Sequence, residues 1–324
     1  MQRLSSSRGG GDQSTATATA APSPSSSCDI IAGLDEVIPA NGQLMKPGKA
    51  ATASVYRAKL AGHARVVTLS WSRHAFSVSV SGADGSSASC KVELRRSPWQ
   101  YFWNPRRQSS SGARRLDLGD GSTPLRVLWD LRRARWHHHG HHGEPCGGSY
   151  YVALEEDSVA GGGGEVVFLV SGGSDPNKMA ALAPVARREH VFGRRGRFAA
   201  KARFGEESTE HEIAIEIDGG GHGGGDEPEM EEMRIGIDGE EAAVVVKRLR
   251  WKFRGNQSVT FGKAKVEVYW DVHDWLFTEG AGVVRPALFI FRPIVLSSSG
   301  DGAAAANAAA GAGFCLYLYA WKLD

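Results

Sequence analysis

Long apolar runs are absent from this chain of 324 residues, because no stretch of 18 consecutive apolar residues occurs in it. That excludes a membrane-spanning helix. The four cysteines lie far apart and include no CxxC pair, which argues against a disulfide framework and favours a reducing compartment. The N-terminus lacks the apolar segment of a secretory signal. We therefore expect an intracellular protein, cytoplasmic or nuclear. The chloroplast is the alternative, because the tail is rich in Ser, Thr and Ala and poor in acids.

The chain also lacks an excess of positive or negative charge, since its 38 Lys and Arg are balanced by 36 Asp and Glu. This balance points to no polyanionic partner for the chain as a whole. Catalytic motifs are missing as well: there is no G-x-S-x-G nucleophile elbow, no G-x-x-x-x-G-K-[ST] phosphate loop and no complete H-E-x-x-H zinc motif. The sequence thus predicts a protein that is not an enzyme and needs no cofactor.

What the chain does contain is apolar residues in alternation. Hydrophobic residues make up 41% of it, with nine Trp, which is enough for a sizeable core. Ile213, Ile215 and Ile217 alternate with polar residues, and Tyr317, Tyr319 and Trp321 alternate with smaller ones. A period of two is typical of strands, whereas helical spacing is hard to find. We predict an all-β fold with few helices.

Similar segments recur in a constant order along the chain. Ala58 and Ala202 open similar strings 144 residues apart, and the pairs Trp129-Asp130 and Trp270-Asp271 lie 141 residues apart. This spacing predicts two related antiparallel β units in tandem, each a barrel or a sandwich, rather than the short blades of a propeller. The predicted organisation is a disordered tail (1–49), a first unit (50–174), a linker with a short helix (175–187) and a second unit (188–324).

A row of bases is the main candidate for binding. Leu249, Trp251 and Phe253 alternate with basic residues, which predicts a strand with an apolar and a basic face. After a loop at 255–262, the strand 265–272 would return as a hairpin, setting Glu267 and Asp271 opposite the bases. Two acids cannot neutralise four bases, so the surplus charge suits an anionic or protein partner. The candidate residues are Arg248, Arg250, Lys252 and Arg254.

The two Trp-Asp pairs support a rival hypothesis from another class. If the two β units face each other across a cleft, their carboxylates could act as acid and base, or tryptophans could line a ligand pocket. The rival is a small-molecule carrier or cryptic enzyme with a pocket at the unit interface, and core packing remains the simpler interpretation of the tryptophans. Its candidate residues are Trp129, Asp130, Trp270, Asp271, His273 and Asp274.

Two further patterns are weaker. Imidazoles are good transition-metal ligands, but here they crowd one Gly-interrupted loop without rigid support, so no physiological metal site is predicted. The weak candidates are His137, His138, His139, His141 and His142. A second basic stretch, 187–203, has interleaved phenylalanines that would suit nucleic-acid stacking. Acidic residues follow it closely, which favours ion pairs between strands over nucleic-acid binding.

Several strings follow one another in a characteristic order: Cys90-Lys91-Val92-Glu93-Leu94, Trp129-Asp130-Leu131, Tyr150 to Leu154, Glu189 to Gly193, Trp251 to Asn256 and Trp270 to Phe277. Together they resemble a plant family called domain of unknown function 868, over about residues 50–295. The resemblance implies a land-plant protein. It supplies no activity, partner or catalytic residue, so the function has to be argued from the chain itself.

Overall fold

The computed structural model describes residues 51–72, 75–81, 85–94, 110–136, 144–156, 164–172, 182–204, 210–218, 231–239, 242–261, 264–277, 285–294 and 314–323. This part of the chain consists mostly of strands, and its one helix is the short α2 (His273–Phe277). The prediction of an all-β fold with few helices is confirmed. The predicted tail 1–49 lies outside the described residues.

The strands form three sheets, none of which closes into a barrel within the described residues. The largest has nine strands in the order β14 (Arg254–Phe261), β15 (Ala264–Asp271), β16 (Ala287–Pro293), β17 (Cys315–Lys322), β9 (Ala186–Gly193), β1 (Ala51–Leu60), β2 (His63–Ser72), β3 (Ala75–Ser81) and β4 (Ser87–Glu93). The second sheet consists of β5 (Ser111–Leu116), β6 (Leu125–Arg135), β7 (Gly147–Glu156) and β8 (Val166–Gly172). The third consists of β10 (Arg197–Arg203), β11 (Glu210–Asp218), β12 (Glu232–Ile237) and β13 (Val244–Lys247).

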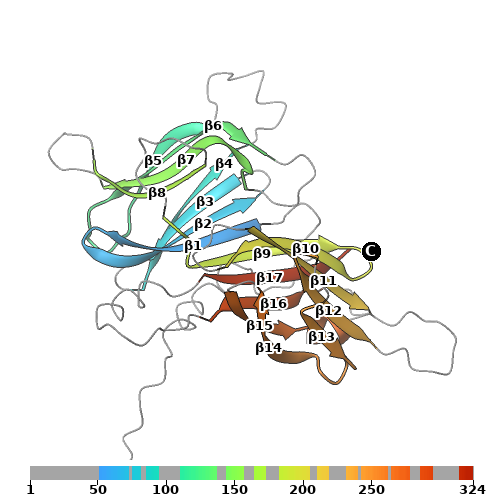
Figure 1. The fold of residues 1–324 in the computed structure, drawn as a ribbon. Coiled ribbons are helices and arrows are strands. Elements are labelled where there is room, and N and C mark those ends of the chain that lie inside the picture. Colours follow the sequence, from blue (N-terminus) through green and yellow to red (C-terminus); the bar gives the residue numbers. More distant parts are fainter. Residues whose placement is uncertain are drawn as a thin grey trace, which may run out of the picture. The chain divides into compact units, whose positions relative to one another are not determined.

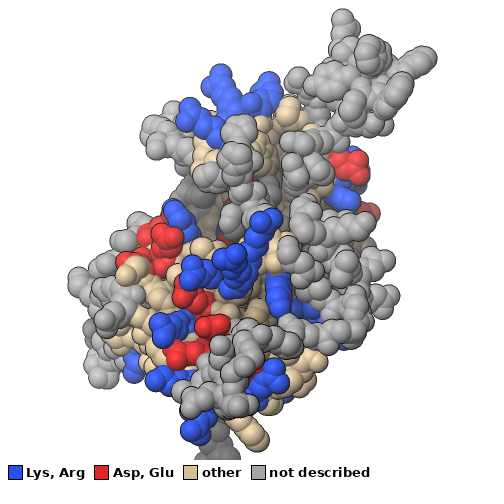
Figure 2. Space-filling view, turned by 90° about the vertical axis from the view of Figure 1, so that its right-hand side faces the viewer, with Lys and Arg blue, Asp and Glu red and all other residues tan. Residues whose placement is uncertain are grey.

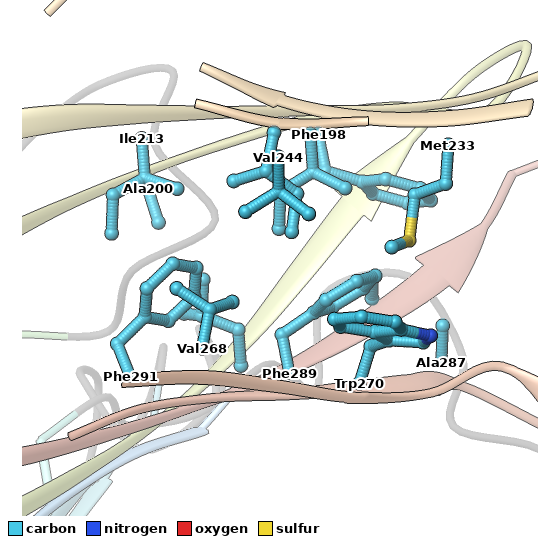
Figure 3. Packing of buried hydrophobic residues seen from close by; sticks show 14 of the residues in the cluster. Phe198, Ala200, Ile213, Met233, Val244, Val268, Trp270, Ala287, Phe289 and Phe291 are labelled. Atoms are coloured by element: carbon cyan, nitrogen blue, oxygen red, sulfur yellow. The ribbon is translucent and has the colours of Figure 1, made fainter. Parts of the chain in front are cut away.

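Two hydrophobic cores lie between these sheets. One joins β1–β4 to β5–β8, and the other joins β14–β17 to β10–β13 (Figure 1). In the second core, Phe289 and Phe291 of β16 face Phe198 and Ile213 of the opposite sheet (Figure 3). The alternation seen in the sequence produces this arrangement, because every second side chain of a strand points to the same face. Each half of the protein is therefore a sandwich rather than a barrel.

The strand β9 joins the two sandwiches, since it pairs with β1 in antiparallel and with β17 in parallel orientation. We call the junction formed by β17, β9 and β1 the seam. Across it, Leu318 pairs with Glu189, Glu189 with Thr52, and Thr52 with Trp71 of β2. Directly opposed residues point to the same side of a sheet, so both cores lie on one side of the nine-stranded sheet. The strand begins at Ala186, inside the stretch predicted as a linker. Of the short helix predicted there, residues 175–181 lie outside the described residues, and 182–185 form no helix.

The two Trp-Asp pairs occupy matching positions. Trp129 on β6 lies over Gly112 of β5, and Trp270 on β15 lies over Gly255 of β14. A β-carbon would stand 2.7 Å from the Trp129 ring at Gly112 and 2.4 Å from the Trp270 ring at Gly255. Both glycines are therefore required by the close approach of an indole rather than by backbone conformation.

We expect Gly255→Ala and Gly112→Ala each to lower the free energy of unfolding by about 1–3 kcal/mol, since the added methyl group overpacks the site. Urea denaturation measures this. Gly147→Ala in β7 is the control, because no atom lies within 4 Å of the added carbon. Combining Gly255→Ala with Trp270→Phe tests the cause: if the smaller ring recovers none of the loss, contact with the indole is not the reason for it.

Candidate functional site

The basic row lies on a turn rather than on a strand. β13 ends at Lys247 and β14 begins only at Arg254. Between them the chain reverses direction, with Arg248 in the left-handed region at φ 57° and the Trp251 N–H donating to the Arg248 carbonyl at 2.9 Å. The prediction of one basic strand face is therefore wrong. So is the predicted loop at 255–262, because most of it forms β14, whose hairpin partner is β15.

Packing and hydrogen bonds fix this turn. Leu249 is fully buried in the core, and its N–H donates to the Glu231 carbonyl at 3.0 Å. The Trp270 indole N–H donates to the Lys252 carbonyl at 3.0 Å. The turn is thus a rigid part of the sandwich edge and presents its outward side chains in a defined direction.

Trp251 lies on the outward side of this turn, and 86% of its surface is exposed. The alternation in the sequence instead predicts one apolar strand face that Trp251 shares with Leu249 and Phe253. Two residues further on, the Phe253 ring packs edge-on against Phe277, at 5.9 Å between centroids, and Phe277 is itself exposed. His273 packs against both phenylalanines. We call this group the Trp251 surface; it comprises Arg248, Trp251, Lys252, Phe253, His273 and Phe277.

The four bases of the predicted row differ in their partners. Arg250 is ion-paired to Glu231 at 2.6 Å, and Arg254 to Asp271 at 2.8 Å, so the predicted cross-strand contact to Asp271 is present. The other predicted acid, Glu267, pairs instead with Arg292 of β16 at 2.5 Å. Arg248 and Lys252 are exposed, and no described acidic residue forms an ion pair with either of them. Among the described residues, Arg248 and Lys252 are therefore two cations of the Trp251 surface that no ion pair offsets.

Charge is distributed differently on the nearby sheet. On β10 and β11, Arg197 pairs with Glu216 at 3.4 Å and Lys201 with Glu210 at 3.8 Å. Figure 2 shows blue and red side chains side by side on the part of the molecule where Figure 1 places these strands. At least these two bases of the second basic stretch are thus paired with acidic residues of the neighbouring strand, which is the kind of cross-strand contact that the sequence predicts.

The structure places the residues of the rival hypothesis in separate sandwiches: Trp129 and Asp130 lie on β6, and the others lie on β15 and α2. Trp129 and Trp270 are buried, each in its own core. Asp271 accepts a hydrogen bond from the His273 N–H at 3.1 Å at the start of α2. His273 Nδ1 lies 2.9 Å from Asp274, which also pairs with Arg285 at 2.8 Å. The His273 contact and then the Arg285 contact lower the pKa of Asp274.

Asp130 lies elsewhere, at an irregularity where β6 shifts register against β7 between Asp130 and Arg133. It lines an open pocket of about 370 Å³ together with Arg132, Arg133, Ser149, Tyr150 and Tyr151. Hydrogen bonds from the Arg132 guanidinium lower the pKa of Asp130 to about 2. This carboxylate is ionised at neutral pH, which is opposite to what a general acid needs.

A buried polar group at the seam was missed by sequence reasoning. On β9, Arg187 is ion-paired to Glu189 at 2.6 Å and to Glu144 at 2.7 Å. Burial and then the charge of Glu144 raise the pKa of the neighbouring Tyr56 to about 12. An Arg-Arg-Glu-His run inside a central strand resembles an exposed segment in sequence, so no local signal indicates that it is buried.

The histidine cluster, His137, His138, His139, His141 and His142, lies outside the described residues. Within the described part of the chain, no group of three or more His, Cys, Asp or Glu is arranged to hold a metal ion. No described helix is long and apolar enough to cross a bilayer.

The fold and the site define an all-β protein of two sandwiches that share one nine-stranded sheet, with a rigid aromatic and basic turn at one edge. The chain belongs to the family described as Plant protein of unknown function (DUF868), which it matches over residues 47–322. Comparisons with curated proteins and with solved structures found no match.

Proposed function

We propose that this protein is a non-enzymatic binding protein that recognises an anionic partner through the Trp251 surface. The observation that carries the proposal is Trp251 itself: a rigid turn holds it outward with 86% of its surface exposed, beside Arg248 and Lys252. Tryptophan and arginine are the residues that most often dominate binding energy at interfaces. A turn fixed before binding also loses little conformational entropy when a partner docks.

The charge at this turn supports an anionic partner over a neutral one. Arg250 and Arg254 are compensated by Glu231 and Asp271, whereas Arg248 and Lys252 form no ion pair with any acidic residue in the described part of the chain. Clustered uncompensated cations concentrate counter-ions and attract polyanions. A carrier or enzyme acting through Asp130 or Asp274 is less favoured, because ion pairing lowers the pKa of both carboxylates.

The double variant Arg248→Glu/Lys252→Glu tests the proposal. Binding of the full chain to heparin is measured over a salt series. We expect the slope of log affinity against log salt to fall by about 2, since each lost cationic contact releases about one counter-ion less. The matched control is Arg133→Glu/Arg135→Glu, which makes the same charge change at exposed positions of β6 and should keep most of the affinity.

Equal losses in both double variants would mean that only the overall charge matters, and the assignment to the Trp251 surface would fail. Circular dichroism of each variant checks that the fold is kept. The four substituted side chains are all exposed, so little loss of stability is expected.

Two sequence predictions remain proposals. The matching strand order and the matching Gly-Trp contacts in the two sandwiches support an internal repeat. The dispersed cysteines support an intracellular compartment, cytoplasmic or nuclear, with the chloroplast as the alternative. A protein partner for the Trp251 surface is the alternative to a simple anionic ligand.

A further inference from the structure

We infer that the anionic partner of the Trp251 surface is the headgroup region of a lipid bilayer, with the Trp251 indole inserted at the membrane–water interface. This inference rests on the proposed function and names the class of partner. It follows from the shape of the turn, the chemistry of its aromatic side chains and the position of its charges.

The shape of the turn favours a partner whose surface is flat and deformable. Trp251 projects from the link between two strands with most of its ring in solvent. Single-stranded nucleic acid is bound in grooves whose aromatic side chains stack on successive bases. Trp251 projects from a turn and, among the described residues, is not one of a row of rings lining a groove, so it offers no such track. A protein partner would need a pocket shaped to receive it, whereas a bilayer interface accommodates a projecting ring without any matching shape.

The chemistry of the side chains also fits a bilayer interface. Tryptophan is enriched there because its ring is apolar and its N–H can still bond to water or headgroups. Phe277, 47% exposed, is a second aromatic ring in solvent, and it packs against Phe253, which follows Trp251 by two residues in the chain. These rings would enter only to headgroup depth, which suits a protein that binds the membrane from outside.

The charges lie where headgroups would be. Arg248 and Lys252 flank Trp251 at distances of three residues and one residue in the chain, on the same turn. Basic side chains beside an inserted aromatic residue are attracted to anionic lipids at the membrane surface. The long stems of Arg and Lys also let their charges reach the phosphates while their methylenes remain near the apolar ring.

The experiment uses the full chain with vesicles of phosphatidylcholine alone and of phosphatidylcholine with phosphatidylserine. Wild type should sediment with the anionic vesicles only, and less so as salt rises. Its tryptophan emission should shift to the blue and be quenched by brominated acyl chains. Trp251→Ala should weaken vesicle binding at least about tenfold and abolish the blue shift. Arg248→Glu/Lys252→Glu should weaken it about 30-fold or more.

The matched control is Trp136→Ala. Trp136 is also partly exposed and follows Arg133 and Arg135, so it resembles Trp251 in local composition. Trp136→Ala should leave vesicle binding and the blue shift intact. Equal losses in the two tryptophan variants would overturn the assignment of the insertion to Trp251.

Binding to heparin and to a single-stranded oligonucleotide, measured in parallel, distinguishes a failure of the bilayer inference from a failure of the proposed function. Binding to heparin that depends on Arg248 and Lys252, without any binding to anionic vesicles, overturns the bilayer inference and leaves the proposed function standing. Oligonucleotide binding that requires Trp251, again without vesicle binding, also overturns it. If the wild type binds none of the three probes, the proposed function itself is overturned. Vesicle binding that needs Trp251, together with heparin binding that does not, supports both.

Discussion

Replacing Arg187 by methionine is expected to lower the free energy of unfolding by about 3–5 kcal/mol. Arg187 lies on β9, the strand that joins the two sandwiches, and bonds to both Glu189 and Glu144. Glu189 is only 2% exposed, so loss of the guanidinium leaves a buried carboxylate without its partner. An uncompensated buried charge costs far more than the ion pair itself contributes. Methionine keeps most of the volume, which limits any cavity effect.

Chemical denaturation of Arg187→Met and of a surface counterpart, Arg197→Met, measures this difference. Arg197 pairs with Glu216 on an exposed sheet face, where an ion pair contributes about 0–1 kcal/mol. The double variant Arg187→Met/Glu189→Gln should recover part of the loss, because it removes the stranded charge. If Arg187→Met loses no more stability than Arg197→Met, the seam does not depend on this charge network.

The alternation of apolar and polar residues makes most of the strands predictable from the sequence. Ile213, Ile215 and Ile217 point into a core, and so do Trp129 and Trp270, because a half-buried strand needs one apolar face. The continuity of the nine-stranded sheet could not be predicted. It depends on β9, whose partly buried Arg187 and buried Glu189 give that strand the composition of an exposed segment. Pairing between strands far apart in the chain leaves no local signal.

The sequence predicts which bases belong to the candidate site, but it does not predict how the backbone arranges them. The bases 248–254 were identified, yet Leu249, Trp251 and Phe253 were expected on one inward face. Arg248 adopts a left-handed backbone conformation that favours Gly or Asn, and nothing in its neighbourhood indicates a turn. The chain therefore reverses at that point, Leu249 enters the core and Trp251 is turned out to solvent.

His190, also on β9, gives a large expected dependence of stability on pH. It is buried and stacked on Tyr319 at 5.1 Å between centroids, and its Nδ1 accepts a hydrogen bond from the Trp321 indole at 2.9 Å. Burial and then the positive charge of Arg188 lower its pKa from 6.5 to about 4. Protonation of Nδ1 would also remove the acceptor that Trp321 uses, so the folded protein holds this imidazole neutral.

Because the pKa of His190 is lower in the folded than in the unfolded chain, the unfolded chain binds the proton more readily as pH falls below 6.5. The stability that the neutral form contributes should therefore be complete above that pH and be lost toward pH 4, a difference of about 3 kcal/mol. His190→Gln keeps an acceptor for Trp321 and does not titrate. Urea denaturation of both proteins between pH 7 and pH 4 isolates the effect, since their other titrating groups are shared. We expect the stability of wild type relative to His190→Gln to decrease by about 3 kcal/mol over this range; a constant difference would show that His190 has an ordinary pKa in the folded protein.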